Sequence, residues 1–464
     1  MDRRTFLSGA GAASLAPMSS SAALPQVESA SPSSGRPPNI VYILFDKCRR
    51  DAFGCYDLRT VHTPNIDRMA SEGVRFNNCY TPQALCAPAR ASILTGAFPH
   101  AHGLQRNPYP SIPGQGNSTY QEAIPDPFRD TRFQLWDNFA QLLNASGYAT
   151  AHIGKWHLGE GNPGFFDYWK SFNSLLLHWI GEPHNSRYRP DVHTEQGVRF
   201  IERHKDEPFL LYQSYYAPHA PYDPPKEYLE HYPNEEHAGY YGSVSNLDWN
   251  VGRIVAALEE QGILDETLLI IGTEHGTSWV DRPGTVEGLC TSYDETSRVP
   301  LVMRYPRLLP QGKAWKAGVS LVDIMPTILE AAGVRAETGT VETYPFPLLQ
   351  GRSLIADIRA GNDRWDRPIV VENVPQAAID GAFFDERALR TEHYKLIMRK
   401  YHSRPQMRPG ELYDLRSDPG ETRNLFEASA HRAVRTEMAA TLEEWGRKYE
   451  DDVAIELGAW ASSA

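Results

Sequence analysis

The sequence predicts an α/β fold, with a large mixed, mostly parallel sheet flanked by helices and a smaller C-terminal α+β domain. Nearly unbroken apolar segments at 39–45, 208–213 and 267–272 are typical of strands buried on both faces of a parallel sheet. Helical patterns lie between these segments, and this alternation indicates parallel pairing. After about Tyr344 the segments become shorter, which indicates a second domain containing an antiparallel sheet.

The chain begins with a segment whose pattern indicates targeting. Arg3 and Arg4 precede an apolar, Gly/Ala-rich run that ends in small residues, so residues 1–24 are expected to be a signal peptide of the twin-arginine type. The alternative is a chance arginine pair on a tail. Residues 25–38, rich in Pro and Ser, are expected to be a linker. No later stretch reaches the roughly 18 apolar residues of a membrane span, so we expect a periplasmic or secreted protein that is not integral to a membrane.

Residues 39–343 are expected to form the larger domain. Its strands are the three apolar runs named above, and its helices are expected at 65–71, 135–145, 243–260 and 321–332. Asp46 follows the first strand, and Glu274 and His275 follow the last. Because ligands bind at the carboxyl ends of such strands, these three residues are candidate site residues.

Residues 344–464 are expected to form the smaller domain. Strands are expected within 388–399 and 411–415, followed by a helix over 431–449.

The net charge and the cysteine content limit which classes of protein this chain can belong to. The chain has 464 residues, with 46 Lys and Arg against 58 Asp and Glu, a formal net charge of −12. This balance argues against general affinity for nucleic acid, which needs a basic surface. The five cysteines are an odd number without a CxxC pair, and we favour buried free thiols for three of them, Cys48, Cys55 and Cys79.

The most informative segment is 85–96, LCAPARASILTG. It contains Cys86, Pro88 and Arg90 at the spacing Cys-x-Pro-x-Arg, followed by Thr-Gly. Here the chain resembles the sulfatase family. The resemblance extends over nearly the whole mature chain through segments in one order: PNIVYILFD, TPNIDRMASEGVRF, TGAFPHAHG, GKWHLG, PHAPY, GTEHG, SRVPL, RTEHYKLI and ELYDLRSDPGETRNL. It implies an alkaline-phosphatase-like fold and hydrolysis of sulfate esters.

Cys86 is the expected nucleophile position. It precedes a helix expected to begin near Pro88, so free backbone N–H groups would face residue 86 and attract an anion. In the family this cysteine is oxidised to formylglycine by a maturation enzyme. The aldehyde hydrate attacks sulfur, and the sulfate hemiacetal then collapses, which divides one displacement into two easier steps. The alternative is a buried or merely reactive thiol.

The expected metal ligands are Asp46, Glu274 and His275, with formylglycine at position 86 as a further ligand. Oxygen-rich ligands favour Ca²⁺ or Mg²⁺, whereas a histidine also admits Mn²⁺ or Zn²⁺. The resemblance implies calcium. The alternative for Glu274 and His275 is a loop pair that caps the next element.

Five further residues match the family's pattern. Arg90, one turn from Cys86, is expected to orient the nucleophile. Lys155 and His157 stand two apart, so in an extended segment they would point the same way; the resemblance implies a sulfate-binding cation and a proton donor to the leaving group. His219 is the other matching histidine, and Asn107 matches a polar substrate contact.

Three positions depart from the family's pattern. Lys47 stands where a second acid, Gln or Thr is usual, and a protonated lysine cannot ligate a cation, so we expect it to bind substrate or point elsewhere. Glu274 replaces the usual Asp. Leu289, four residues before Tyr293, stands where many members have a lysine.

The leading functional hypothesis is sulfate ester hydrolysis on a sulfated carbohydrate. The first alternative is phosphodiester or phosphonate monoester hydrolysis. The second is an inactive sulfatase-like protein that binds glycans, which the Lys47 and Leu289 departures motivate. Substrate specificity is expected to lie in the loops 106–132 and 165–189.

Overall fold

The computed structural model describes residues 36–56, 60–108, 136–159, 161–174, 176–181, 186–280, 288–335, 349–374, 384–402 and 410–463. The predicted signal peptide at 1–24 and most of the linker lie outside this part of the chain. So do the predicted domain boundary at 343/344 and most of the loop 106–132.

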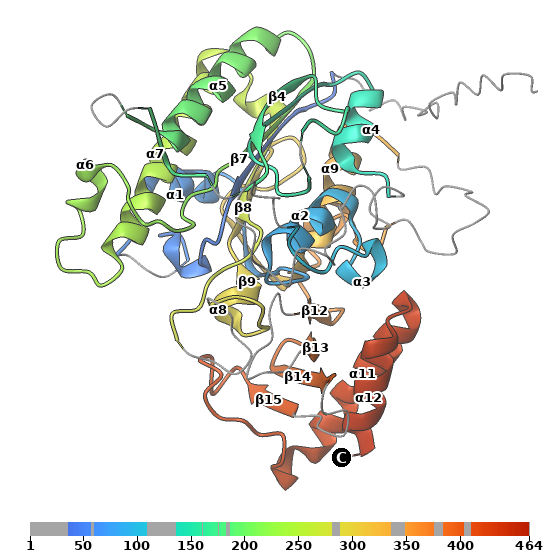
Figure 1. Ribbon diagram of the computed structural model, residues 1–464. Helices are drawn as coiled ribbons and strands as arrows, with labels where there is room; N and C mark the ends of the chain where they lie inside the picture. The colour runs from blue at the N-terminus through green and yellow to red at the C-terminus, as the bar shows by residue number, and fades with distance from the viewer. Residues whose placement is uncertain are drawn as a thin grey trace, which may run out of the picture.

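A nine-stranded mixed sheet forms the centre of the larger domain (Figure 1). Its central strands pair in parallel, and only β10 and β9 run antiparallel to their neighbours. From one edge to the other the strands are β11 (Lys313–Ser320), β2 (Val74–Tyr80), β10 (Leu301–Arg304), β8 (Thr267–Thr273), β1 (Asn39–Phe45), β7 (Phe209–Ser214), β3 (Ala149–Lys155) and β4 (Tyr168–Phe172), with β9 (Arg298–Val299) paired to β2. The predicted mixed, mostly parallel sheet is confirmed.

Helices cover both faces of this sheet, and each face has its own apolar core. Alternate side chains of β1 enter opposite cores, because successive residues of a strand point to opposite faces. One core is closed by α1 (Pro64–Ser71), α5 (Arg189–His204) and α7 (Ala238–Glu260). The other is closed by α2 (Cys86–Thr95), α4 (Phe139–Ala145), α9 (Ile324–Ala332) and α10 (Ile355–Ala360). Short helices lie in the connections: α3 (Pro99–His102), α6 (Lys226–Leu229) and α8 (Asp294–Ser297).

A four-stranded antiparallel sheet forms the C-terminal part (Figure 1). Its strands are β12 (Ile369–Asn373), β13 (Phe384–Arg390), β14 (Tyr394–Tyr401) and β15 (Gly410–Asp414), and it packs against α11 (Arg432–Tyr449) and α12 (Asp452–Ser463). The core between sheet and helices also contains Phe98 and Val322 of the larger domain. The predicted C-terminal antiparallel sheet is therefore confirmed, and it is joined to the larger domain by apolar contacts.

Several predicted element bounds were wrong. The helix expected from 135 begins at Phe139, because Asn138 caps it by accepting a hydrogen bond from the backbone N of Gln141 at 2.9 Å. The helix expected from 243 begins five residues earlier, at Ala238. The segment 388–399 spans two strands, because the chain reverses between β13 and β14 and the N of Thr391 donates to the O of Tyr394.

The five cysteines are free thiols in the structure, as predicted for Cys48, Cys55 and Cys79, although Cys55 is only partly buried. Within the described residues, no helix combines the length and apolar character needed to cross a bilayer.

Candidate active site

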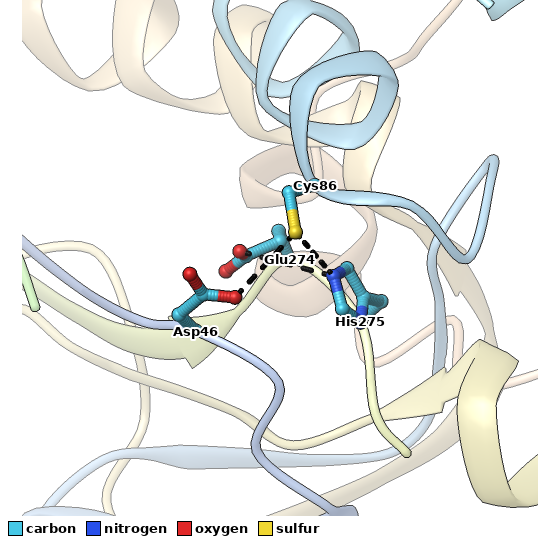
Figure 2. A group of neighbouring side chains, drawn as sticks. All are labelled: Asp46, Cys86, Glu274 and His275. Atoms are coloured by element: carbon cyan, nitrogen blue, oxygen red, sulfur yellow. Dashed lines mark hydrogen bonds and ion pairs between the residues drawn. The ribbon is translucent and has the colours of Figure 1, made fainter. Parts of the chain in front are cut away.

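The carboxyl ends of four adjacent parallel strands, β8, β1, β7 and β3, meet at one edge of the large sheet. Asp46 directly follows β1, Glu274 and His275 directly follow β8, and Lys155 is the last residue of β3. Helix α2 brings Cys86 to the same place, and Figure 2 shows its thiol pointing at the side chains of Asp46, Glu274 and His275. The predicted site residues are therefore brought together by the strand order.

Asp46, Cys86, Glu274 and His275 form a buried cluster whose ligand atoms all lie within 4.8 Å of one another (Figure 2). The Cys86 Sγ lies 3.7 Å from Oδ1 of Asp46 and 3.1 Å from Nε2 of His275. Nδ1 of His275 donates to the O of Gly276 at 2.8 Å, so Nε2 presents its lone pair to the cluster. This donor set can hold a divalent cation.

The carboxylate of Glu274 gives a second reason to expect a cation there. Its Oε2 is buried and has no hydrogen-bond partner in the part of the chain that the structure describes. Burying an unpaired carboxylate oxygen is costly, and a hard divalent cation would satisfy it. The residues present therefore fit the metal that the sulfatase pattern implies.

Two buried cations balance the carboxylates. The ammonium of Lys155 forms an ion pair with Oδ2 of Asp46. The guanidinium of Arg90 donates to the O of Lys155 and to Oγ of Ser214, both at 2.7 Å, and to Oε1 of Glu274 at 3.1 Å. Arg90 thus joins the ends of β3, β7 and β8, and it orients the carboxylate of Glu274, a candidate metal ligand.

The two carboxylates have opposite pKa shifts. Burial alone would raise the pKa of Asp46, but Lys155, His219 and Arg90 outweigh it and hold this pKa well below its usual range. Burial raises the pKa of Glu274 well above its usual range, and Arg90 only partly offsets this effect while Asp46 adds to it. Two carboxylates this close share the available positive charge unequally, which a bound cation would change.

His157 reaches the site by a different backbone path from the predicted one. The extended segment ends at Lys155, and His157 has a left-handed conformation with φ of 59°, so the argument from strand alternation was wrong. Its ring is nevertheless buried among the site's charges. Burial, followed by the charges of Lys155 and Arg90, holds the pKa of His157 well below its usual range.

His219 lies in the loop after β7 and is partly exposed, in contrast to His157. Its Nδ1 donates to the O of Ala220 at 2.9 Å, and its ring stacks on that of Tyr216 with centroids 4.6 Å apart. Burial lowers the pKa of His219 to about 4, although Asp46 partly opposes this shift. In the protein without substrate, burial therefore favours the neutral form of both histidine rings.

The first turn of α2 differs from the prediction. The helix begins at Cys86 itself, so Pro88 is its third residue. The N of Ala87 donates to Oδ1 of Asn107 at 2.9 Å, which gives Asn107 a contact with the start of this helix. Leu289 packs against Leu85, the residue immediately before the helix.

Lys47 is buried, with 6% of its surface exposed, and its backbone has a left-handed φ of 63°. Its O accepts a hydrogen bond from the hydroxyl of Tyr240 at 3.2 Å. Its positive charge acts to lower the pKa values of Cys86, His219 and His275. Lys47 therefore adds positive charge to the site.

The sequence analysis missed two residues of the site. Ser214, the last residue of β7, accepts from Arg90 and donates to the O of Lys155 at 2.7 Å. Tyr216 lies beneath Lys155, whose Nζ is 5.0 Å from its ring centroid. The rule that site residues follow parallel strands would have found both, because β7 lies between two strands that were used.

Comparison with known proteins identifies the family. A family model described as "Sulfatase" matches residues 38–334, more than half of the chain. The chain belongs to the sulfatase family. A second model, "N-sulphoglucosamine sulphohydrolase, C-terminal", matches residues 290–448. This sulfatase is thus related to sulfuric ester hydrolases in both of its parts.

Relatives with curated names include three sulfatases whose names specify a substrate. The N-acetylglucosamine-6-O-sulfatase of Bacteroides thetaiotaomicron is 25% identical, with 89% of this chain and 87% of that protein covered. An ulvan-active sulfatase of Formosa agariphila is 27% identical, with 87% and 80% covered. The N-acetylgalactosamine-6-sulfatase of Sus scrofa is 30% identical, with 68% and 67% covered.

Solved structures share the fold. One, determined in complex with its substrate D-glucosamine-2-N,6-O-disulfate, has a TM-score of 0.72 and 23% identity, covering 90% of this chain and 99% of that one. The phosphonate monoester hydrolase of Agrobacterium radiobacter has a TM-score of 0.69 and 20% identity, covering 89% and 96%.

Proposed function

We propose that this sulfatase cleaves sulfate esters of a carbohydrate with formylglycine made from Cys86 and a bound divalent cation, calcium. The observation that carries the proposal is the buried cluster of Asp46, Cys86, Glu274 and His275, with Arg90 and Lys155 against it. A sulfate ester is anionic, and a site with these cations can bind it and offset charge on the leaving oxygen.

The state of the Cys86 thiol supports modification. Burial, followed by the negative charge of Asp46, raises the pKa of the thiol. A thiol that stays protonated at neutral pH is a weak nucleophile. Formylglycine at this position would supply a hydroxyl nucleophile and a metal ligand, and the cation would supply Lewis-acid stabilisation of the sulfate oxygens.

The other side chains have distinct roles in this proposal. Lys155, which already pairs with Asp46, would bind a sulfate oxygen, and Arg90 would hold Glu274 in its ligand position. His157 and His219 would donate or accept protons at the leaving oxygen and the nucleophile. His219, being partly exposed, faces the side on which the alcohol of the substrate must leave. Lys47 and Asn107 are proposed as further substrate contacts.

The carbohydrate assignment rests on the relatives, whose names specify N-acetylhexosamine sulfates and ulvan. We also propose export: Arg3 and Arg4 support a twin-arginine signal and a periplasmic or secreted location. Because this route exports folded protein, the maturation enzyme would have to modify Cys86 in the cytoplasm. Comparison of periplasmic and cytoplasmic fractions of its host, with and without an Arg3→Lys, Arg4→Lys pair, tests the location.

A second candidate function is phosphodiester or phosphonate monoester hydrolysis. Lys47 in place of a second acid favours it, because the cluster then holds a single carboxylate from β1, and the site gains positive charge. A third, glycan binding without turnover, is opposed by the assembled cluster, which a binding protein would not need.

One experiment separates these functions. Protein purified from its own host is digested, and the mass of the peptide that contains Cys86 is measured by mass spectrometry. Conversion of the thiol side chain to an aldehyde is expected to lower this mass. The same protein is then assayed on the sulfate monoester and the phosphate diester of one chromogenic alcohol, with Cys86→Ala as control. Modified protein with faster sulfate cleavage supports the proposal. Faster phosphate diester cleavage supports the second candidate, and an unmodified thiol without turnover supports the third.

A further inference from the structure

The loop that carries His219 has two different supports. At its start, the N of Asp46 donates to the O of Ala217, and the N of Tyr215 donates to the O of Leu44, so β1 holds the residues just after β7. From His219 onward the loop accepts hydrogen bonds from His178 and Trp179. These two residues stand at the start of a short antiparallel pair, β5 (Trp179–Ile180) and β6 (Arg187–Tyr188).

We call residues 176–181 and 186–189 the strap. Two of its side chains donate hydrogen bonds to backbone carbonyls of the His219 loop. Nε2 of His178 donates to the O of His219 at 2.7 Å, and Nε1 of Trp179 donates to the O of Asp223 at 2.9 Å. These bonds fix the loop on both sides of Ala220 and Pro221.

His178 also supports the ring of His219. The centroid of the His178 ring lies 5.2 Å from that of Tyr216, and the Tyr216 ring also stacks on that of His219, with centroids 4.6 Å apart and planes inclined by 21°. His178 itself is 1% exposed. One buried side chain therefore contacts both the backbone of His219 and the aromatic ring against which His219 stacks.

The strap is itself anchored, so it can act as a fixed support. The N of Arg189, the first residue of α5, donates to the O of His178 at 2.6 Å, and Nε of Arg189 donates to the O of Leu177 at 2.7 Å. Tyr188, 2% exposed, packs its ring against those of His178 and Trp179. Helix α5 therefore holds His178 in place, and His178 in turn holds the backbone of His219.

We propose that His178 is a positioning residue that aims His219 at the leaving oxygen of the substrate. The inference rests on the proposed function, because it assigns His219 to the leaving-group side of the site. His178 itself contacts no substrate. General acid catalysis needs His219 as the imidazolium, a form that the charge of a bound sulfate ester favours, with its Nε2–H within hydrogen-bond reach of the leaving atom. Small displacements of such a group are costly.

A leaving-group series tests the proposal. A merely structural defect lowers the amount of active enzyme and reduces turnover of every ester by one factor. A displaced proton donor instead matters most for esters of weakly acidic alcohols, whose leaving oxygen needs a proton. The substrates are 4-nitrophenyl sulfate and an alkyl sulfate, and the variants are His178→Phe, His178→Gln, Trp179→Phe and His193→Gln.

We expect His178→Phe to lower kcat on the alkyl sulfate roughly ten- to hundredfold and on 4-nitrophenyl sulfate less than threefold, with KM little changed. His178→Gln keeps an amide donor near the position of Nε2 and should recover most of the lost kcat. Trp179→Phe removes the second bond of the strap and should act in the same direction, which keeps the test valid if His178→Phe does not fold. His193 is a buried histidine of α5 without this contact, so its variant should affect both esters equally.

The inference is overturned if the His178 and Trp179 variants leave both rates unchanged or lower them by one common factor. Failure of the proposed function is a separate outcome: wild-type protein with formylglycine would then cleave neither sulfate ester.

Discussion

Replacement of Arg90 tests whether the guanidinium holds the site together. Arg90 is 1% exposed and makes three hydrogen bonds, to Lys155, Ser214 and Glu274. Arg90→Met removes all three and leaves two buried carboxylates with one cation fewer. Breaking a buried ion pair from one side costs about 3–5 kcal/mol. If this cost is felt in the transition state, kcat/KM falls by roughly 10²- to 10⁴-fold, at 1.36 kcal/mol for each factor of ten.

Arg90→Lys should lie between wild type and Arg90→Met. A lysine keeps the charge but presents one compact ammonium instead of a planar fork, so it cannot bond all three acceptors. Hydrogen bonds to charged groups contribute about 1.5–3 kcal/mol each, so loss of one predicts a roughly ten- to hundredfold lower kcat/KM.

The assay is kcat/KM on a chromogenic sulfate ester, corrected for the formylglycine content of each preparation by peptide mass spectrometry. Arg304→Met is the matched control, because Arg304 is also buried and pairs with Glu72 and Asp265 away from the site. It should lower resistance to denaturant and leave kcat/KM unchanged. Arg90→Met protein that folds and keeps kcat/KM within threefold of wild type would refute the reasoning.

Three further predictions address the metal, the substrate contact and the domain interface. Calcium added to chelator-treated protein should raise the unfolding temperature of wild type and raise that of Glu274→Gln less, measured by calorimetry; equal shifts would contradict the assigned ligand. Lys47→Thr should raise KM for a sulfate ester with kcat little changed, and an unchanged KM would show that Lys47 does not bind substrate. His100→Gln should cost about 1.5–3 kcal/mol of unfolding free energy near pH 6 and less near pH 9, measured by denaturant titration. The sign follows because burial lowers the pKa of His100 but Glu372 and Asp451 raise it further. A group whose pKa is higher in the folded than in the unfolded protein contributes its full stabilisation of the fold at pH values below the unfolded-state pKa. This contribution is lost as the pH rises through the folded-state pKa. Equal losses of unfolding free energy in His100→Gln at pH 6 and at pH 9 would contradict this prediction.

The parts of the fold that the sequence predicts best are those buried on both sides. The strand Asn39–Phe45 was predicted to the residue, because burial on two faces requires a continuous apolar run. The reversal near Thr391 was missed, since it contains neither Gly, Pro nor Asn. Helix α12 was missed because its Ala- and Gly-rich sequence has a weak apolar periodicity, and it is held by packing against α11 and the sheet.

Asp46, Glu274, His275, Lys155 and Cys86 lie together because each stands at a strand end or at a helix start. The site residues that were not predicted contact groups that are far away from them in the sequence. The contact of His178 with the O of His219 spans 41 positions, and nothing in either local sequence indicates it. Asn107 was predicted from its motif, but the hydrogen bond that it accepts from the N of Ala87 was not, because a motif identifies a residue and leaves its partner open.

The C-terminal sheet contacts the loop that precedes Cys86. The N of Ala84, two residues before Cys86, donates to Oδ1 of Asn373 at 3.2 Å, and the N of Glu372 donates to the O of Pro82 at 2.7 Å. Asn373 is fixed in turn, since its Nδ2 donates to Oε1 of Glu386 at 2.8 Å.

This network continues into the interior of the small domain. Oε2 of Glu386 accepts from Nε of Arg399 at 2.6 Å, and all of these side chains are buried. Buried polar groups of this kind are costly to leave unpaired, so the loop before Cys86 and the C-terminal sheet favour a single relative arrangement. The loop before Cys86 is thus supported by the small domain as well as by the sheet that carries the candidate metal ligands. For this reason the larger domain alone should not reproduce the geometry of the site, even though it contains every side chain of the cluster in Figure 2.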